Sequence, residues 1–173
     1  MLTFGHGRLD RDALGALLTG AGVERLVDVR RYPGSRSNPA AAAGQVEDLA
    51  RALGIDYRHD ERLGGRRRLT ADDAASNPDT WWQVTQFRAY AGWTRSPEFR
   101  LALDKLLSDD GEARTAVMCS EAVWWRCHRR IIADVLTLEH HRTVQHLMHD
   151  GALRDHPPSE AAHPGPDGQL VWA

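Results

Sequence analysis

Short apolar stretches alternate with segments of helical periodicity almost from the first residue, and this alternation constrains the fold more than any other feature. LTF near the start and LVDV around residue 27 have the length and composition of buried strands. Between them, Leu14, Leu17 and Leu18 recur at the spacing of a helix. Strands that alternate with helices form a parallel sheet with helices on both faces. The sequence therefore predicts an α/β sandwich of three layers with a mostly parallel sheet.

The remaining elements continue the same pattern. Strands are expected at 2–4, 26–29, 55–58, 115–119 and 143–148. Helices are expected at 11–20, 46–53, 81–91, 97–107 and 126–136. RYPGSRSNP is dense in turn formers and is expected to be a loop, and a longer polar loop is expected from 59 to 77.

A chain of 173 residues is long enough for one domain with a proper core. We expect that domain to span 1–150. The segment 151–173 is rich in Pro, Gly and His, so we expect a loosely packed tail, which the apolar LVW near its end could anchor.

The composition is that of an ordinary globular protein, with 42% hydrophobic and 27% charged residues and a formal charge of -2. No apolar run approaches the roughly 18 residues of a membrane span. The opening MLTFGHGRLD lacks the basic start and apolar core of a signal peptide. We expect a cytoplasmic protein with reduced thiols and no membrane partner.

Arginine supplies nearly all of the positive charge, because Lys105 is the only lysine. Codon bias in a GC-rich genome explains this, and so does a need for guanidinium groups that bind phosphate or carboxylate. A near-neutral chain does not resemble a non-specific DNA coat, which is strongly basic. A local anion site is compatible with the sequence.

Polar side chains follow the predicted strands at their carboxyl ends. His6 follows the first strand, Asp28 and Arg30 end the second, and Cys119 with Glu121 ends the fourth. Ligands of open parallel sheets bind beyond this edge. We therefore predict a pocket there, with these residues on its walls; each of them taken singly could equally have a structural role.

Two arginine-containing segments add candidate anion ligands. The loop at 31–39 offers Ser35 and Arg36, whose hydroxyl and guanidinium groups suit phosphate or carboxylate. Arg126 and Arg129 flank the start of the last predicted helix.

The two cysteines of the chain leave several alternatives open. Strand, Cys119, loop, arginine, helix is the layout of rhodaneses and cysteine phosphatases, but those have five residues between Cys and Arg, and SEAVWW is six without a glycine. Cys119, Cys127 and His128, with His6, could bind zinc, although their spacing is unlike the usual zinc motifs. A permanent disulfide is disfavoured in a reducing compartment, and a redox-switchable pair stays open. We expect no cofactor, with zinc as the minor alternative.

Four segments resemble the bacterial family known as domain of unknown function 488: TFGHG, LVDVRRYPGSRSNP, IDYRHDERLGG and MCSEAVWWRCHRRIIADVL. The resemblance covers roughly residues 2 to 151 and implies a Rossmann-like α/β sandwich. It brings no established reaction. The positions that match the family motifs are His6, Asp28, Arg30, Ser35, Arg36, Gly64, Gly65, Cys119, Glu121, Cys127, His128 and Arg129.

We therefore expect an enzyme that acts on a nucleotide, nucleoside or nucleic-acid substrate by hydrolase- or transferase-type acid/base chemistry. The candidate catalytic residues are Asp28, Glu121, Cys119 and His6. The candidate ligands of a small anionic or nucleotide-like molecule are Arg30, Ser35, Arg36, Arg126, Cys127, His128 and Arg129. The alternatives are a non-catalytic nucleotide or nucleic-acid binding module and a purely structural polar network.

Overall fold

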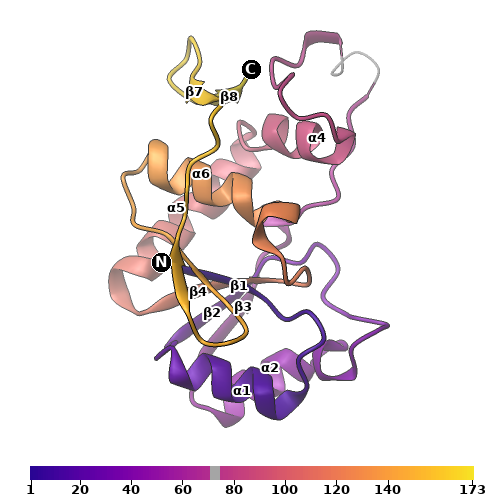
Figure 1. Ribbon diagram of the computed structural model, residues 1–173, viewed down its shortest axis with the longest axis vertical. Helices are drawn as coiled ribbons and strands as arrows, with labels where there is room; N and C mark the ends of the chain where they lie inside the picture. The colour runs from indigo at the N-terminus through magenta and orange to yellow at the C-terminus, as the bar shows by residue number, and fades with distance from the viewer. Residues whose placement is uncertain (71–74) are drawn as a thin grey trace.

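A six-stranded sheet forms the centre of the computed structural model, which describes residues 1–70 and 75–173. The strands lie in the order β3-β2-β4-β1-β5-β6 (Figure 1). Neighbours among β1 to β5 pair in parallel, and β6 pairs antiparallel to β5. Their bounds are Leu2–Gly5, Arg25–Asp28, Asp56–His59, Thr115–Cys119, Gln145–Leu147 and Leu153–Asp155 for β1 to β6.

Helices cover both faces of this sheet (Figure 1). On one face, α1 (Arg11–Gly20) and α2 (Gln45–Ala52) bury Leu14, Leu18 and Val46 against the sheet. On the other face, α5 (Pro97–Glu112) and α6 (Arg129–Leu138) enclose a second core, and α4 (Thr85–Trp93) packs at its end. The predicted three-layer α/β fold is confirmed.

Local signals start several helices where the sequence predicts. The carboxylate of Asp10 accepts a hydrogen bond from the Ala13 amide at 2.8 Å and caps α1. The hydroxyl of Ser96 caps α5 in the same way, with Pro97 at the first helical position. α5 continues to Glu112, beyond the predicted end at residue 107.

Two helices start later than predicted because the residues before them adopt other structure. α4 begins at Thr85 rather than near Trp81, whose amide donates to the Trp172 carbonyl at 3.0 Å. α6 begins at Arg129, because Trp124–Arg126 forms a separate 3-10 turn and Cys127 is extended. The predicted loop at 59–77 contains another 3-10 turn, Glu61–Leu63, and lies partly outside the described residues.

The C-terminal segment is anchored at its end by the apolar LVW stretch, as the sequence allowed. β7 (Ala162–Pro164) and β8 (Leu170–Trp172) form a two-stranded sheet, and β8 is buried throughout. The reason is a buried carboxylate on α6. Asp134 accepts hydrogen bonds from the Trp172 indole, the His156 ring and the Ser159 amide, each at 2.9 Å.

The sheet register brings the predicted site residues to one edge. Gly5 lies beside Cys119, and Asp28 lies beside Met118, so β1, β2 and β4 end at nearly the same level. The segments that follow these strands therefore meet above the carboxyl edge. Among the described residues, no helix is both long and apolar enough to cross a bilayer.

Removing the Asp134 carboxylate should destabilise the whole chain. Asp134→Ala leaves three buried donors without their acceptor, so we expect the free energy of unfolding to fall by about 3 kcal/mol. Urea unfolding measures this change. Glu160→Ala, an exposed carboxylate of the same segment, is the control and should change stability by less than about 0.5 kcal/mol. Equal effects of the two substitutions would contradict the anchoring role of Asp134.

Candidate functional site

A cavity of about 810 Å³ opens at the carboxyl edge of the sheet. This volume lies in the range of small-molecule sites. Nine of the eleven predicted site residues line it: His6, Arg30, Ser35, Arg36, Cys119, Glu121, Arg126, Cys127 and His128. Asp28 and Arg129 do not line it. The predicted convergence of strand-end residues is therefore observed for most of the set.

Glycines allow the walls of this cavity to approach closely. A Cβ atom on Gly65 would lie 2.8 Å from Nδ1 of His128, and one on Gly64 would lie 2.8 Å from the Arg31 amide nitrogen. A Cβ on Gly5 would lie 1.8 Å from the Glu121 carbonyl oxygen. Any larger residue at these three positions would push the walls apart.

Two thiols and an imidazole cluster at the floor. Nδ1 of His128 lies 3.8 Å from Sγ of Cys119 and 3.6 Å from Sγ of Cys127. The three atoms lie within 4.8 Å of one another. All three residues are largely buried and line the cavity. Nε2 of His128 is buried and has no partner within the described part of the chain.

The buried guanidinium of Arg129 lies behind this cluster. It donates to Sγ of Cys127 at 3.4 Å, to the Thr3 hydroxyl at 3.4 Å and to the Glu121 carbonyl. None of these acceptors is a carboxylate. A buried cation needs a compensating negative charge, and the Cys127 sulfur is the contact that can provide it.

The two thiols have opposite ionisation tendencies. Burial opposes ionisation of Cys127, but the hydrogen bond from Cys119 and the charge of Arg129 outweigh it and lower the pKa of Cys127 well below its usual value. The hydrogen bond to Cys127, together with burial, raises the pKa of Cys119 well above its usual value. Ionisation of the pair is therefore favoured at Cys127 rather than at Cys119.

Asp28 has no free acceptor for a substrate proton. Its carboxylate accepts from Nε and Nη2 of Arg30, with the shortest contact at 2.6 Å, and from the Tyr57 hydroxyl at 3.0 Å. Its side chain is completely buried. Burial and the proximity of Asp28 raise the pKa of Tyr57, so this hydroxyl keeps its proton. Asp28 positions Arg30 and does not reach the cavity.

His6 lies on the cavity wall in a fixed tautomer. Its Nδ1 donates to the Gly7 carbonyl at 3.0 Å, which leaves the lone pair on Nε2, 3.5 Å from Nη1 of Arg30. Burial lowers the pKa of His6. The Nε2 lone pair is therefore directed at the Arg30 guanidinium.

The loop after β2 supplies part of the rim. Asn38 fixes this loop by donating to the Gly7 and Leu9 carbonyls, and the Ser35 hydroxyl accepts from the Asn38 amide at 3.0 Å. Arg36 extends from the loop to solvent and lines the mouth.

The loop after β4 supplies another part of the rim. Glu121 is exposed, and its Oε1 accepts from the Val123 amide at 3.2 Å, which leaves the second carboxylate oxygen available. Arg126, in the 3-10 turn, is also exposed and lines the cavity.

Charge is unevenly distributed around this site. Its described walls carry five arginines and one carboxylate, Glu121, although the whole chain has a formal charge of -2. Within the described residues, the guanidinium groups of Arg36, Arg66 and Arg126 have no hydrogen-bond or ion-pair partner. These groups are free to bind an anion.

Several wall residues were not predicted from the sequence. Tyr32, Phe87 and Tyr90 contribute aromatic surface, and Arg31 and Arg66 contribute charge. The arginine run after Leu-Gly-Gly was the available signal for Arg66. Nothing local in the sequence places α4 over the site, so Phe87 and Tyr90 had no signal.

A buried polar chain behind the site was also missed. The Thr3 hydroxyl contacts His146 at 2.7 Å, His146 contacts His156 at 3.0 Å, and His156 reaches Asp134. Burial and the adjacent His156 lower the pKa of His146 to about 3. The ring of Trp124 stacks on His146 with centroids 4.1 Å apart. This chain connects the C-terminal segment to Arg129.

Comparison with known proteins gives one match. The family model described as Domain of unknown function DUF488 matches residues 10–136, which is more than half of the chain. Neither the curated proteins nor the solved structures contain a match. The matched region includes every wall residue of the cavity except His6.

The lowered pKa of Cys127 gives a pH-dependent prediction. Because the thiolate is the reactive form, iodoacetamide should modify Cys127 before Cys119 in metal-free protein, with a midpoint below the ordinary thiol pKa of about 8.5. Cys119→Ala removes the donor and should move the midpoint to higher pH, whereas Cys119→Ser keeps a hydroxyl donor and should move it less. Peptide mapping across pH measures this. Preferential modification of Cys119 would contradict the assignment.

Proposed function

Because the chain belongs to the DUF488 family, whose description names no reaction, we propose its function from the geometry of the site. We propose an enzyme that hydrolyses or transfers a group on a phosphate-bearing substrate of nucleotide or nucleic-acid type. A divalent metal of the zinc class, held by Cys119, Cys127 and His128, would serve as its cofactor. The cluster of two thiols and one imidazole, in a cavity that unpaired arginines also line, is the observation that carries this proposal.

The spacing of the three ligand atoms supports a metal. Zinc binds sulfur at about 2.3 Å and imidazole nitrogen at about 2.0–2.1 Å, so tetrahedral geometry separates S from N by about 3.6 Å. The two observed S–N distances are 3.6 and 3.8 Å. Catalytic zinc sites have three protein ligands and keep the fourth position open. All three ligands line the cavity, so a metal bound there would face it.

Each residue then has a defined task. Cys119, Cys127 and His128 would hold the metal, which when bound would supply Lewis-acid activation of a water nucleophile at neutral pH. Glu121, with one free carboxylate oxygen at the cavity wall, would act as the general acid or base. Arg129 holds Cys127 in place through Nε, and Arg36 and Arg126, from two different loops, would bind the phosphate.

The nucleotide character of the substrate rests on the aromatic and apolar walls. Tyr32 is 63% exposed and Val84 is 55% exposed, and both line the cavity beside the arginines. Exposed apolar surface next to unpaired guanidinium groups suits a molecule that combines a planar base with phosphate. The proposal requires both thiols reduced, which agrees with the cytoplasmic location expected from the sequence.

Metal binding provides the first test. We expect purified protein to bind one zinc ion per chain, and Cys119→Ala, Cys127→Ala and His128→Ala each to weaken binding at least about 100-fold. Elemental analysis and competition with a chromogenic chelator measure stoichiometry and affinity. His163→Ala, which removes an exposed histidine of β7, is the control and should bind as the natural chain does. Unchanged affinity in folded His128→Ala protein would exclude this cluster.

Turnover provides the second test. On a panel of nucleotides and short oligonucleotides, Glu121→Gln should lower kcat about 100-fold or more with little change in KM. Arg36→Ala and Arg126→Ala should raise KM, because they remove phosphate ligands. Arg114→Ala, an exposed arginine at the start of β4 and thus at the opposite edge of the sheet, should change neither constant. Ligand binding without turnover across the panel would favour the binding-module alternative.

A further inference from the structure

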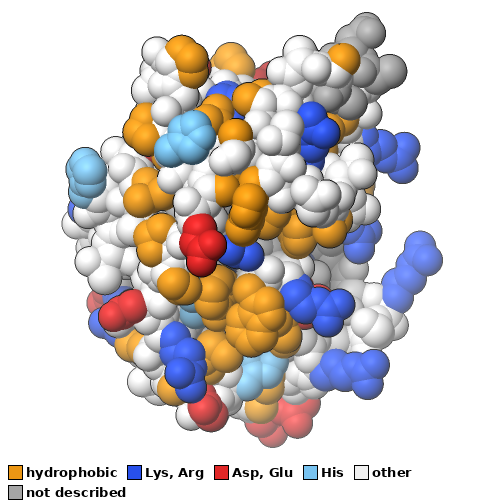
Figure 2. Space-filling model, turned by 45° about the horizontal axis from the view of Figure 1, so that its top comes forward, with side chains coloured by type: hydrophobic (Ala, Val, Ile, Leu, Met, Phe, Trp, Pro, Cys, Tyr) orange, Lys and Arg blue, Asp and Glu red, His pale blue; other side chains and the backbone are white. Residues whose placement is uncertain are grey.

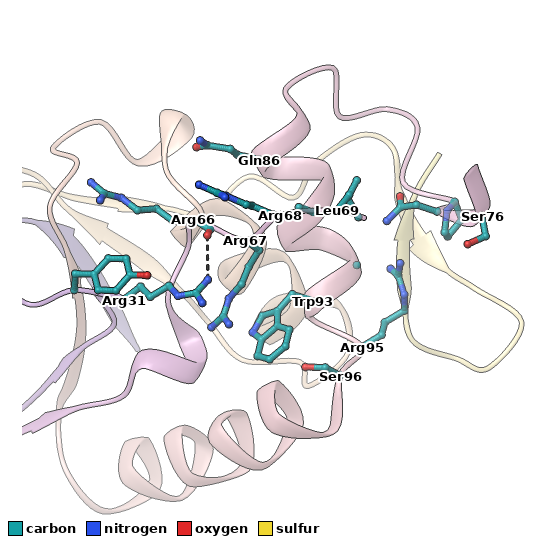
Figure 3. Close-up of a pocket in the computed structure, with 15 residues that line it drawn as sticks. Arg31, Arg66, Arg67, Arg68, Leu69, Ser76, Gln86, Trp93, Arg95 and Ser96 are labelled. Atoms are coloured by element: carbon teal, nitrogen blue, oxygen red, sulfur yellow. Dashed lines mark hydrogen bonds between the residues drawn. The ribbon is translucent and has the colours of Figure 1, made fainter. Parts of the chain in front are cut away.

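A second cavity adjoins the proposed active site. It has a volume of about 1320 Å³ and shares Arg31, Tyr32, Arg66 and Gln86 with the first. Figure 3 shows its walls, with the arginine run on one side and α4 with Trp93 beside it. The shared residues place the two cavities side by side. A ligand longer than one nucleotide could occupy both.

The second cavity is the more basic of the two. Its described lining contains no carboxylate and five arginines, namely Arg31, Arg66, Arg67, Arg68 and Arg95. On the face shown in Figure 2, basic side chains gather along the right-hand side and acidic ones lie mostly elsewhere. A chain with a formal charge of -2 thus places eight arginines on the described walls of the two cavities. Such a surface attracts a polyanion.

The arginines of this cavity fall into two groups. Arg67 and Arg95 are held in place: Arg67 donates to the Gly64 carbonyl at 3.0 Å and lies 3.8 Å from the centroid of the Trp93 ring, and Arg95 pairs with Asp79. These contacts form a rigid wall. Arg66 and Arg68, in contrast, are exposed and have no side-chain partner in the described part of the chain.

The backbone of Arg66 is strained, which indicates that its side chain has a function. Its φ is +59°, a conformation that glycine adopts without penalty and that costs other residues roughly 1 kcal/mol. A glycine would therefore be the more stable choice after Gly64-Gly65. Arg66 lines both cavities, and a glycine at this position would have no guanidinium to contribute there.

We propose that the second cavity binds the sugar–phosphate backbone of a single-stranded nucleic acid whose terminal nucleotide occupies the first cavity. This inference rests on the proposed function, because that function places the terminal nucleotide of the strand in the first cavity. It adds the class of the substrate, a single-stranded nucleic acid. Arg66 and Arg68 contact successive phosphates, and Tyr32, at the junction, stacks a base. Arg31 donates to the Arg66 carbonyl at 3.1 Å and fixes the two segments that form the junction.

The shape and the side chains favour a single strand over other polyanions. The site is concave, whereas a duplex would need a helix or ribbon that projects into its groove. Single-strand sites combine a basic groove with aromatic side chains for stacking, and both are present here. An acidic peptide or inorganic polyphosphate would use the charge but not the exposed ring of Tyr32.

Residues that line only one cavity allow a crossed experiment. Arg36 lines the first cavity alone, and Arg68 lines the second alone. Fluorescence anisotropy measures the binding of a mononucleotide and of DNA and RNA oligonucleotides of increasing length. The protein is depleted of metal, so that the ligands are not turned over during the measurement. Arg66→Gly is added because it removes the junction side chain while relieving the positive φ, and Arg114→Ala is the control.

The expected result is a difference between ligands. Affinity should rise with length until about four nucleotides are bound and then level off. Arg68→Ala should weaken oligonucleotide binding about tenfold, lower its salt slope by about 0.7, and leave mononucleotide binding unchanged. Arg36→Ala should weaken both ligands. Arg66→Gly should weaken oligonucleotide binding without lowering the melting temperature.

The contrary results separate this inference from the proposed function. If oligonucleotides bind no more tightly than the mononucleotide, or if Arg68→Ala acts like Arg114→Ala, the second cavity is not a nucleic-acid site, whatever the enzyme does. Equal competition by polyphosphate or an acidic peptide of the same charge would also overturn it. Oligonucleotide binding that depends on Arg68 in a protein without catalytic activity would support the inference and reject the enzyme.

Discussion

The buried guanidinium of Arg129 holds the candidate site together. It contacts Thr3 of β1, the Glu121 carbonyl after β4 and the Cys127 sulfur that precedes α6. The first strand and the 121–127 segment, far apart in the sequence, thus share one cation that is 1% exposed. Without a carboxylate among its contacts, this cation draws negative charge toward the thiol. The interaction that fixes the fold at this edge therefore also sets the chemical state of the site.

Close packing around Arg129 follows from that arrangement. A Cβ atom on Gly5 would lie 2.9 Å from Nη2 of Arg129 as well as against the Glu121 carbonyl, so the strand can end there only as glycine. On the far side of Thr3, His146 and His156 carry the hydrogen-bonded chain to Asp134. The buried C-terminal strand is thus connected, through His156, His146 and Thr3, to the same guanidinium that orients Cys127. For this reason, we expect substitutions in the segment 151–173 to alter the site around Arg129 and Cys127.

The sequence predicted those features that local rules determine. Strand-helix alternation predicted the sandwich, and the rule that parallel strands end together predicted that His6, Cys119 and Glu121 would meet. Asp28 obeyed the same rule, yet its side chain turns to Arg30 and Tyr57 beneath the cavity, because a strand-end position does not determine which partner a carboxylate finds. Likewise, the late start of α4 depends on a contact between Trp81 and Trp172 of β8, 91 residues away in the chain, which no local signal reveals.

Arginine content shows most clearly what composition alone leaves undecided. Codon bias could explain the abundance of arginine, but it does not determine where each arginine lies. The structure shows that the arginines occupy different environments. Arg30 is buried against Asp28, Arg129 is buried against a thiol, and Arg36, Arg66 and Arg126 are unpaired around one depression in the described structure. A single unpaired guanidinium is common on a protein surface. Several guanidinium groups on one concave wall, with a single carboxylate among the described residues there, repel one another. That repulsion is relieved when an anion binds, so the free energy of the empty site itself favours a polyanionic ligand.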